Sequence, residues 1–246
     1  MTTPKGLFGL VAIVCIVLML GAFLLLRSSF KHEAMKAIPT EQTATFDKTL
    51  YSLNDPTSIW VIVNKQRQLD PKEYEPADLR TPNMDVESAD MKLSDATSTA
   101  LEKLASAASK EGVDFVVASA YRSYSEQKTV YASMVRGYGQ EEADRESARP
   151  GHSEHQTGLA LDLGSKNGLC RIEACFANTK EGKWLAANAY KYGFIIRYAE
   201  GKEQITGYNY EPWHIRYIGT LLSTDMHRTN TQTLEEFFGL PPAPNY

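Results

Sequence analysis

The sequence predicts an α+β fold, in which a small, mostly antiparallel central sheet with flanking helices follows one N-terminal transmembrane helix. Three observations support this fold class. An uncharged apolar run lies near the N-terminus. From about residue 48 to residue 246, apolar runs and turn signals alternate without a repeat or a low-complexity tract, which favours one domain. Within that region helical and strand patterns do not alternate regularly, unlike in a parallel sheet wound with helices on both sides.

The N-terminal apolar run extends from Leu7 to Leu26. A transmembrane helix needs about 20 apolar residues, so this run is long enough to cross a bilayer. The alternative is a cleavable signal peptide, whose apolar region is shorter, about 7–15 residues, and ends at a small-residue site. This run ends instead in Leu24-Leu25-Leu26-Arg27. We therefore expect residues 1–27 to be a retained single-pass membrane anchor, and the polar residues 28–47 to be a stalk.

The first half of the region 48–246 contains two expected strands and two expected helices. Residues 58–64 (SIWVIVN) read as a short strand. Apolar residues then recur at helical spacing from residue 93 to residue 108, and Gly112 ends the pattern. Residues 115–118 (FVVA) predict a buried strand that leads to Arg122. Ser123 and Glu126 form a capping box for a helix that continues to residue 137.

The second half contains three more expected strands and one helix. Residues 159–163 (LALDL) predict a strand, and residues 180–192 predict a helix that Gly193 ends. Residues 194–198 and 213–218 are further strands, with a turn at residues 200–202 between them. This irregular order is the reason for expecting an antiparallel sheet.

Composition and cysteine usage limit the partners and the compartment. The net charge is −4 and no basic patch is interleaved with aromatic residues, so we expect no nucleic acid partner, and we predict no protein partner. Cys170 and Cys175 lie in a loop-like segment without a nearby histidine, which favours a disulfide over a metal site if the domain is outside the cytoplasm. We therefore expect a cell-membrane protein with its domain on the extracytoplasmic side.

Two patterned segments, 153–162 and 211–214, contain a candidate metal centre. His155, Asp162 and His214 are ligand types that suit a catalytic zinc ion. The odd spacing of His155 and Asp162 would place them on opposite faces of one strand, so we expect a turn at residues 156–158 between them. Glu211 precedes a proline, which disfavours helical geometry, and we expect it with His214 at the start of a strand.

The expected chemistry is metal-assisted hydrolysis. Zinc would polarise a scissile carbonyl and lower the pKa of a water molecule towards about 7. Glu211 would take the proton of this water, and Arg122 would face the developing oxyanion or a substrate carboxylate. Each residue alone could be a surface or structural group. Their co-occurrence in two segments favours the metal centre, with His152 outside the ligand set.

Three segments resemble the motif blocks of the VanY-like D-alanyl-D-alanine carboxypeptidase family, which includes LdcB-type L,D-carboxypeptidases. They are SAYRSYSEQ (119–127), PGHSEHQTGLALDLG (150–164) and EPWHIRYIG (211–219). The resemblance covers about residues 54–240 and implies the small α+β fold also seen in the hedgehog signalling domain. It implies zinc ligands His155, Asp162 and His214, the base Glu211, and substrate contacts from Arg122, Gln127 and Ser153.

The expected function is that of a membrane-anchored zinc carboxypeptidase, not a serine enzyme, that removes the C-terminal D-Ala of peptidoglycan stem peptides. Residues 48–246 would be its catalytic domain. A D,D-enzyme acts on pentapeptides; an L,D-carboxypeptidase acting on tetrapeptides is the alternative, because both share these motifs. A zinc amidase or endopeptidase would also use such a metal centre, and the loops around the cleft would decide this. A non-catalytic cell-wall-binding module could keep the same fold, but an intact Glu211 argues against it, since binding needs no base.

Overall fold

The computed structural model describes residues 46–246. The expected membrane anchor (residues 1–27) and nearly all of the expected stalk lie outside the described residues, so both stay predictions. Among residues 46–246, no helix combines the length and the apolar character that crossing a bilayer requires.

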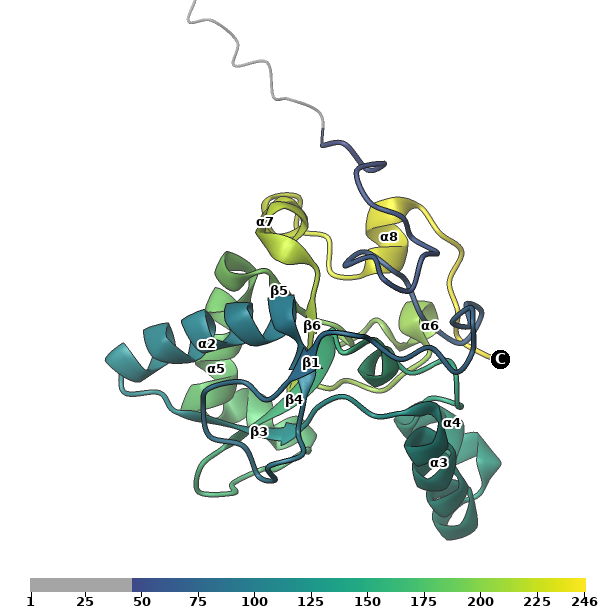
Figure 1. The fold of residues 1–246 in the computed structure, drawn as a ribbon, viewed down its shortest axis with the longest axis horizontal. Coiled ribbons are helices and arrows are strands. Elements are labelled where there is room, and N and C mark those ends of the chain that lie inside the picture. The colour runs from purple at the N-terminus through teal and green to yellow at the C-terminus, as the bar shows by residue number, and fades with distance from the viewer. Residues whose placement is uncertain (1–45) are drawn as a thin grey trace, which may run out of the picture. The chain divides into compact units, whose positions relative to one another are not determined.

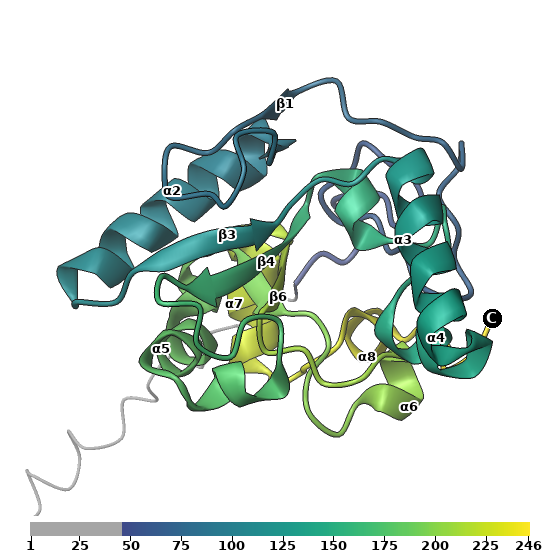
Figure 2. The ribbon, with the colours of Figure 1, turned by 90° about the horizontal axis from the view of Figure 1, so that it is seen from below.

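A four-stranded antiparallel sheet lies at the centre of the fold, in the strand order β3-β4-β6-β5 (Figures 1 and 2). Its strands are β3 (Phe115–Ser119), β4 (Ala160–Ser165), β6 (His214–Tyr217) and β5 (Phe194–Ile196). All three neighbouring pairs are antiparallel, which confirms the expected sheet. A second sheet pairs β1 (Leu79–Arg80) with β2 (Leu93–Ser94).

Helices surround the sheet, which confirms the α+β class. They are α2 (Asp95–Lys110), α3 (Tyr124–Tyr138), α4 (Gln140–Glu146), α5 (Lys180–Asn188), α6 (Glu203–Thr206), α7 (Gly219–Arg228) and α8 (Leu234–Phe238). Three 3₁₀ turns are η1 (Glu154–Thr157), η2 (Ala174–Asn178) and η3 (Ala189–Tyr192). Figure 2 shows α2 alongside β3, with α3 and α4 together beyond one end of the sheet.

The hydrophobic core forms between the sheet and the helices α2 and α5. Leu101 and Leu104 of α2, Leu161 of β4 and Ile215 of β6 belong to one buried cluster that also includes Leu185 of α5. A second cluster joins α7 and α8 to the segment around residue 60. β4 and β6 are the inner strands of the sheet. The candidate metal centre lies where the first residue of β6 pairs with the third residue of β4.

The two helices with clear end signals lie where the sequence places them. Ser94 caps α2 by accepting the N–H of Thr97. Ser123 and Glu126 form the expected capping box of α3. The helix expected at 180–192 is α5 followed by the tighter turn η3, and it ends at Gly193, whose φ of +89° is the left-handed conformation that glycine adopts readily.

The prediction of a strand at residues 58–64 is wrong. Its apolar residues 60–63 are fully buried, as in a strand, but they do not join a sheet. Arg216 donates to the carbonyls of Ile59 and Val61, at 3.1 and 2.7 Å, and Arg67 donates to the carbonyl of Ile62 at 3.1 Å. Arginine side chains therefore satisfy backbone carbonyls that a neighbouring strand would otherwise satisfy.

Candidate metal centre

The three expected ligands meet where His214, the first residue of β6, pairs with Asp162, the third residue of β4. His155, Asp162 and His214 are buried, and one ligand atom from each lies within 4.8 Å of the others. His155 Nε2 is 3.5 Å from Asp162 Oδ2, and His214 Nδ1 is 3.2 Å from Asp162 Oδ1. The carboxylate of Asp162 therefore lies between the two imidazoles.

Local structure explains how these residues converge. Asp162 of β4 is directly opposite His214, the first residue of β6. His155 belongs to η1, which ends at Gly158 with φ of +66°. This turn lies between His155 and Asp162, as their odd spacing requires. A side chain at Gly158 would also approach Leu79 and the backbone of Ser94 to 3.1 Å, so glycine suits this position sterically as well.

The donor set fits a zinc ion. His155 Nδ1 lies 2.7 Å from the carbonyl oxygen of Ala120, so Nδ1–H can donate there and leave Nε2 free to bind a metal. Asp162 Oδ1 is buried without a hydrogen-bond partner among the described residues. A buried, unpartnered carboxylate oxygen between two imidazoles is the environment expected of a metal ligand.

The protein groups alone make this cluster attractive to a cation. Burial raises the pKa of the Asp162 carboxyl, but the neighbouring His155 and His214 outweigh burial and hold that pKa well below its usual range. Burial lowers the pKa of His214, but the adjacent carboxylates of Asp162 and Glu154 outweigh burial and raise that pKa to about 9. The same carboxylates that would attract a proton would attract a metal ion.

Glu211 lies beside the cluster, in the loop that leads into β6. Its Oε2 is 3.5 Å from His214 Nδ1. Burial, reinforced by the charge of Asp162, raises the pKa of the Glu211 carboxyl to about 8, although His214 lowers it. A carboxylate whose pKa is raised towards the working pH is suited to general-base catalysis.

Arg122 extends into the same cleft from the junction of β3 and α3. Its Nη1 donates to Gln127 Oε1 at 2.9 Å, and its Nη2 donates to Ser119 Oγ at 3.2 Å. Gln127 is the one buried residue of α3, and its Nε2 donates to the carbonyl of Ala148 at 2.7 Å. Gln127 therefore fixes the guanidinium, which leaves a positive group facing the cleft.

The cleft has a cavity volume of about 360 Å³. The expected site residues all line it, and they are Arg122, Gln127, Ser153, His155, Asp162, Glu211 and His214. Ile172, on the loop closed by the disulfide between Cys170 and Cys175, lines it as well. His152 does not belong to the ligand cluster, since its Nδ1 lies 2.8 Å from the carbonyl oxygen of Asn64.

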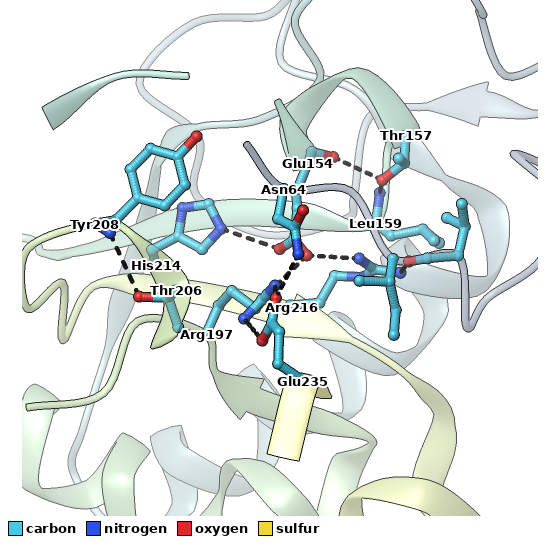
Figure 3. Close-up of polar contacts among 12 residues, drawn as sticks. Asn64, Glu154, Thr157, Leu159, Arg197, Thr206, Tyr208, His214, Arg216 and Glu235 are labelled. Carbon is cyan, nitrogen blue, oxygen red and sulfur yellow. Dashed lines mark hydrogen bonds and ion pairs between the residues drawn. The ribbon is translucent and has the colours of Figure 1, made fainter. Parts of the chain in front are cut away.

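Sequence reasoning missed a group of buried charges behind His214: Glu154, Arg197, Arg216 and Glu235 (Figure 3). Arg216 follows His214 by two residues on β6, so both side chains lie on one face of the strand. The signal that the sequence offers is a charged residue, Arg216, inside a segment that is expected to be a strand. Its partners come from distant segments, which no local pattern connects.

Residues 90–220 match the sequence profile of the family described as "VanY: D-alanyl-D-alanine carboxypeptidase". The chain is 42% identical to the putative carboxypeptidase YodJ of Bacillus subtilis over 194 residues, 77% of this chain and 70% of that protein. It is 43% identical to a D-alanyl-D-alanine carboxypeptidase of Enterococcus faecium over 129 residues, but these are 52% of this chain and only 38% of that protein.

Two solved structures are similar across most of the described region. The LdcB LD-carboxypeptidase is 42% identical with a TM-score of 0.70, and the match covers 75% of this chain and 87% of that one. A mutant of the vancomycin resistance D,D-pentapeptidase VanY, solved in complex with Zn(II), is 30% identical with a TM-score of 0.61. That match covers 72% of this chain and 97% of the other.

Proposed function

The chain belongs to the VanY family of D-alanyl-D-alanine carboxypeptidases, and we propose that it is a zinc-dependent enzyme that hydrolyses the C-terminal D-Ala of peptidoglycan stem peptides. One observation carries this proposal. Two histidines and an aspartate converge around a buried, unpartnered carboxylate oxygen, with the carboxyl of Glu211 on one side and the guanidinium of Arg122 in the same cleft.

His155, through Nε2, and His214, through Nδ1, would hold zinc together with a carboxylate oxygen of Asp162. When bound, zinc supplies Lewis-acid chemistry, polarising the scissile carbonyl and making water a better nucleophile at neutral pH. Glu211 takes the proton of the attacking water and delivers it to the leaving amine nitrogen. This double transfer requires a carboxyl group that can exist in both protonation states near neutral pH, which its raised pKa allows.

Arg122 provides the positive charge that a carboxypeptidase needs. A substrate whose scissile bond is the last one carries a free carboxylate close to the reacting carbonyl. The guanidinium can bind this carboxylate or the oxyanion through charge-assisted hydrogen bonds. Gln127 holds the guanidinium in place, and Ser153, which is buried at the cleft wall, supplies a further polar group for the peptide.

The D,D-activity is the main proposal, because the family and the Enterococcus faecium relative both have the description D-alanyl-D-alanine carboxypeptidase. An L,D-carboxypeptidase acting on tetrapeptide stems is the second candidate. The observation that favours it is the similarity to the LdcB structure, which has the higher identity and TM-score of the two structures described above. A non-catalytic wall-binding module would have no use for a carboxyl group placed like that of Glu211.

We also propose that residues 1–27 anchor the protein in the cell membrane, that residues 28–47 are a stalk, and that residues 48–246 are the carboxypeptidase domain on the extracytoplasmic side. The length of the N-terminal apolar run supports the anchor. The disulfide between Cys170 and Cys175 supports the location, since disulfides persist in oxidising compartments.

The test is hydrolysis of two muropeptides by the purified full chain in detergent, one ending in D-Ala-D-Ala and one in a single D-Ala, with and without a chelator. We expect release of D-alanine from the first, and loss of that release on chelation. Release only from the second would identify the L,D-enzyme. Release from neither, with zinc present, would refute the carboxypeptidase proposal.

A further inference from the structure

Four charged side chains lie fully buried behind the candidate metal centre: Glu154, Arg197, Arg216 and Glu235, each with at most 1% of its surface exposed. Removing charges from water costs several kcal/mol for each ion unless partners compensate it. Because burying these charges is costly, we expect the group to have a role other than packing, and it lies next to the proposed metal ligand His214. Figure 3 shows that it reaches the imidazole of His214.

One carboxylate oxygen of Glu154 is fully occupied by the two arginines. Its Oε1 accepts hydrogen bonds from Arg197 Nε and Arg216 Nη1, both at 2.8 Å. The other two nitrogens of Arg197 donate to Glu235, at 3.0 and 2.7 Å. Arg216 uses its Nη2 on the carbonyls of the segment around residue 60. The position of the Glu154 carboxylate is therefore fixed from behind.

The second oxygen of Glu154 faces His214. Oε2 lies 3.6 Å from His214 Nε2, and neither atom has a hydrogen-bond partner among the described residues. The gap exceeds an ordinary N–H···O bond, and a movement of less than about 1 Å would close it. The other ring nitrogen of His214, Nδ1, faces Asp162 and Glu211 on the metal side. The imidazole of His214 thus has Glu154 near one ring nitrogen and Asp162, another ligand of the cluster, near the other.

The charges within the group balance. Two guanidinium groups compensate the two carboxylates, so Glu154 can accept a hydrogen bond as an anion without a net negative charge behind the ring. A neutral imidazole carries its proton on one nitrogen and binds a metal through the other. A carboxylate that accepts a hydrogen bond from the N–H of one ring nitrogen therefore selects the other nitrogen as the metal ligand.

We propose that Glu154 is a positioning residue whose Oε2 accepts the Nε2–H of His214, so that His214 presents Nδ1 to zinc. Arg197 and Arg216 hold the Glu154 carboxylate in place for this contact. The inference rests on the zinc site proposed above and adds the group that determines the tautomer and orientation of one ligand.

Glu154→Gln tests this directly. Arg197 and Arg216 both donate to Oε1, so the amide oxygen of the glutamine must take that place. Its NH₂ group then faces His214 Nε2 and donates to it, which moves the ring proton to Nδ1, the nitrogen that should bind zinc. We expect zinc affinity, measured by chelator competition on the full chain in detergent, to fall about 10- to 100-fold.

Glu235→Gln is the matched control, because it removes a carboxylate from the same buried group without touching His214. We expect it to lower stability and to leave zinc affinity close to that of the wild type. If both variants lose zinc affinity equally, or if Glu154→Gln binds zinc as the wild type does, the inference is wrong. A wild-type chain that takes up no zinc would overturn the zinc site as well, so the two failures are distinguishable.

A second measurement needs no variant in the charged group. In the zinc-loaded wild-type chain with ¹⁵N-labelled histidines, we expect the nitrogen spectrum of His214 to show a proton on Nε2 and none on Nδ1. A proton on Nδ1 would contradict the proposal, even if Glu154→Gln did not fold.

Discussion

Replacing Glu211 with glutamine should have opposite effects on turnover and on stability. The substitution preserves the size of the side chain and removes its ability to take a proton from water. General-base catalysis contributes about 10²–10⁴-fold to rate, so kcat should fall by that factor while zinc stays bound. Glu211 lies beside His214 but is not one of the three clustered ligands, which is why zinc binding should survive.

The stability effect follows from the pKa of Glu211, which burial raises from 4.5 to about 8. A raised carboxyl pKa means that the fold favours the protonated form, so ionisation costs stability as the pH rises from about 4.5 to about 8. At 1.36 kcal/mol per pKa unit, the cost above this window is on the order of 3–5 kcal/mol. Glutamine has no such cost.

The assay compares denaturant unfolding of the wild type and Glu211→Gln in excess chelator, at several pH values. We expect similar free energies of unfolding near pH 4 and a growing advantage of the variant up to about pH 8. Glu200→Gln, which changes an exposed glutamate, is the control and should alter neither quantity. A variant that keeps wild-type turnover would refute the base assignment, and a pH-independent stability difference would refute the buried-carboxyl argument.

Three further predictions concern other groups. Arg122→Gln should lower kcat/KM about 10- to 100-fold, because charge-assisted hydrogen bonds contribute about 1.5–3 kcal/mol. The control Arg136→Gln changes an exposed arginine and should leave kcat/KM unchanged. Steady-state kinetics that show the same kcat/KM for both variants would contradict this. Chelation should abolish turnover and lower the thermal midpoint, both restored by zinc, because a ligand at 100 times its Kd stabilises by about 2.7 kcal/mol. Glu235→Gln should destabilise the fold by about 3–5 kcal/mol through breaking a buried pair. Burial raises the pKa of Glu235, but Arg197 outweighs burial and holds that pKa below 4.5. The stability of the wild type should therefore fall as the pH drops below about 4.5. Denaturant titrations of Glu235→Gln should show a shallower fall over the same pH range.

Local signals predicted much of the fold. The capping box of Ser123 and Glu126 defines the start of α3 because both of its hydrogen bonds form within four residues. The glycine that ends η3 and the turn between His155 and Asp162 also depend on neighbouring residues only. The site residues could be grouped because two short segments contain most of them, although their convergence requires β4 and β6 to pair.

The failures have a common physical cause. Residues 58–64 have the composition of a strand, but their carbonyls are satisfied by Arg216 from the far end of the chain. Glu154 and Arg197 look like solvated charges in sequence, and only the tertiary fold buries them together. Burial of a charge depends on partners from distant segments, and periodicity carries no information about these.

The central claim is tested most directly by the products formed from one pentapeptide stem that ends in D-Ala-D-Ala. Mass spectrometry of the reaction with the zinc-loaded full chain should show one free D-alanine for each tetrapeptide, and no reaction in excess chelator. Release of the D-Ala-D-Ala dipeptide, cleavage inside the stem, or turnover that is unchanged by chelation would contradict the account.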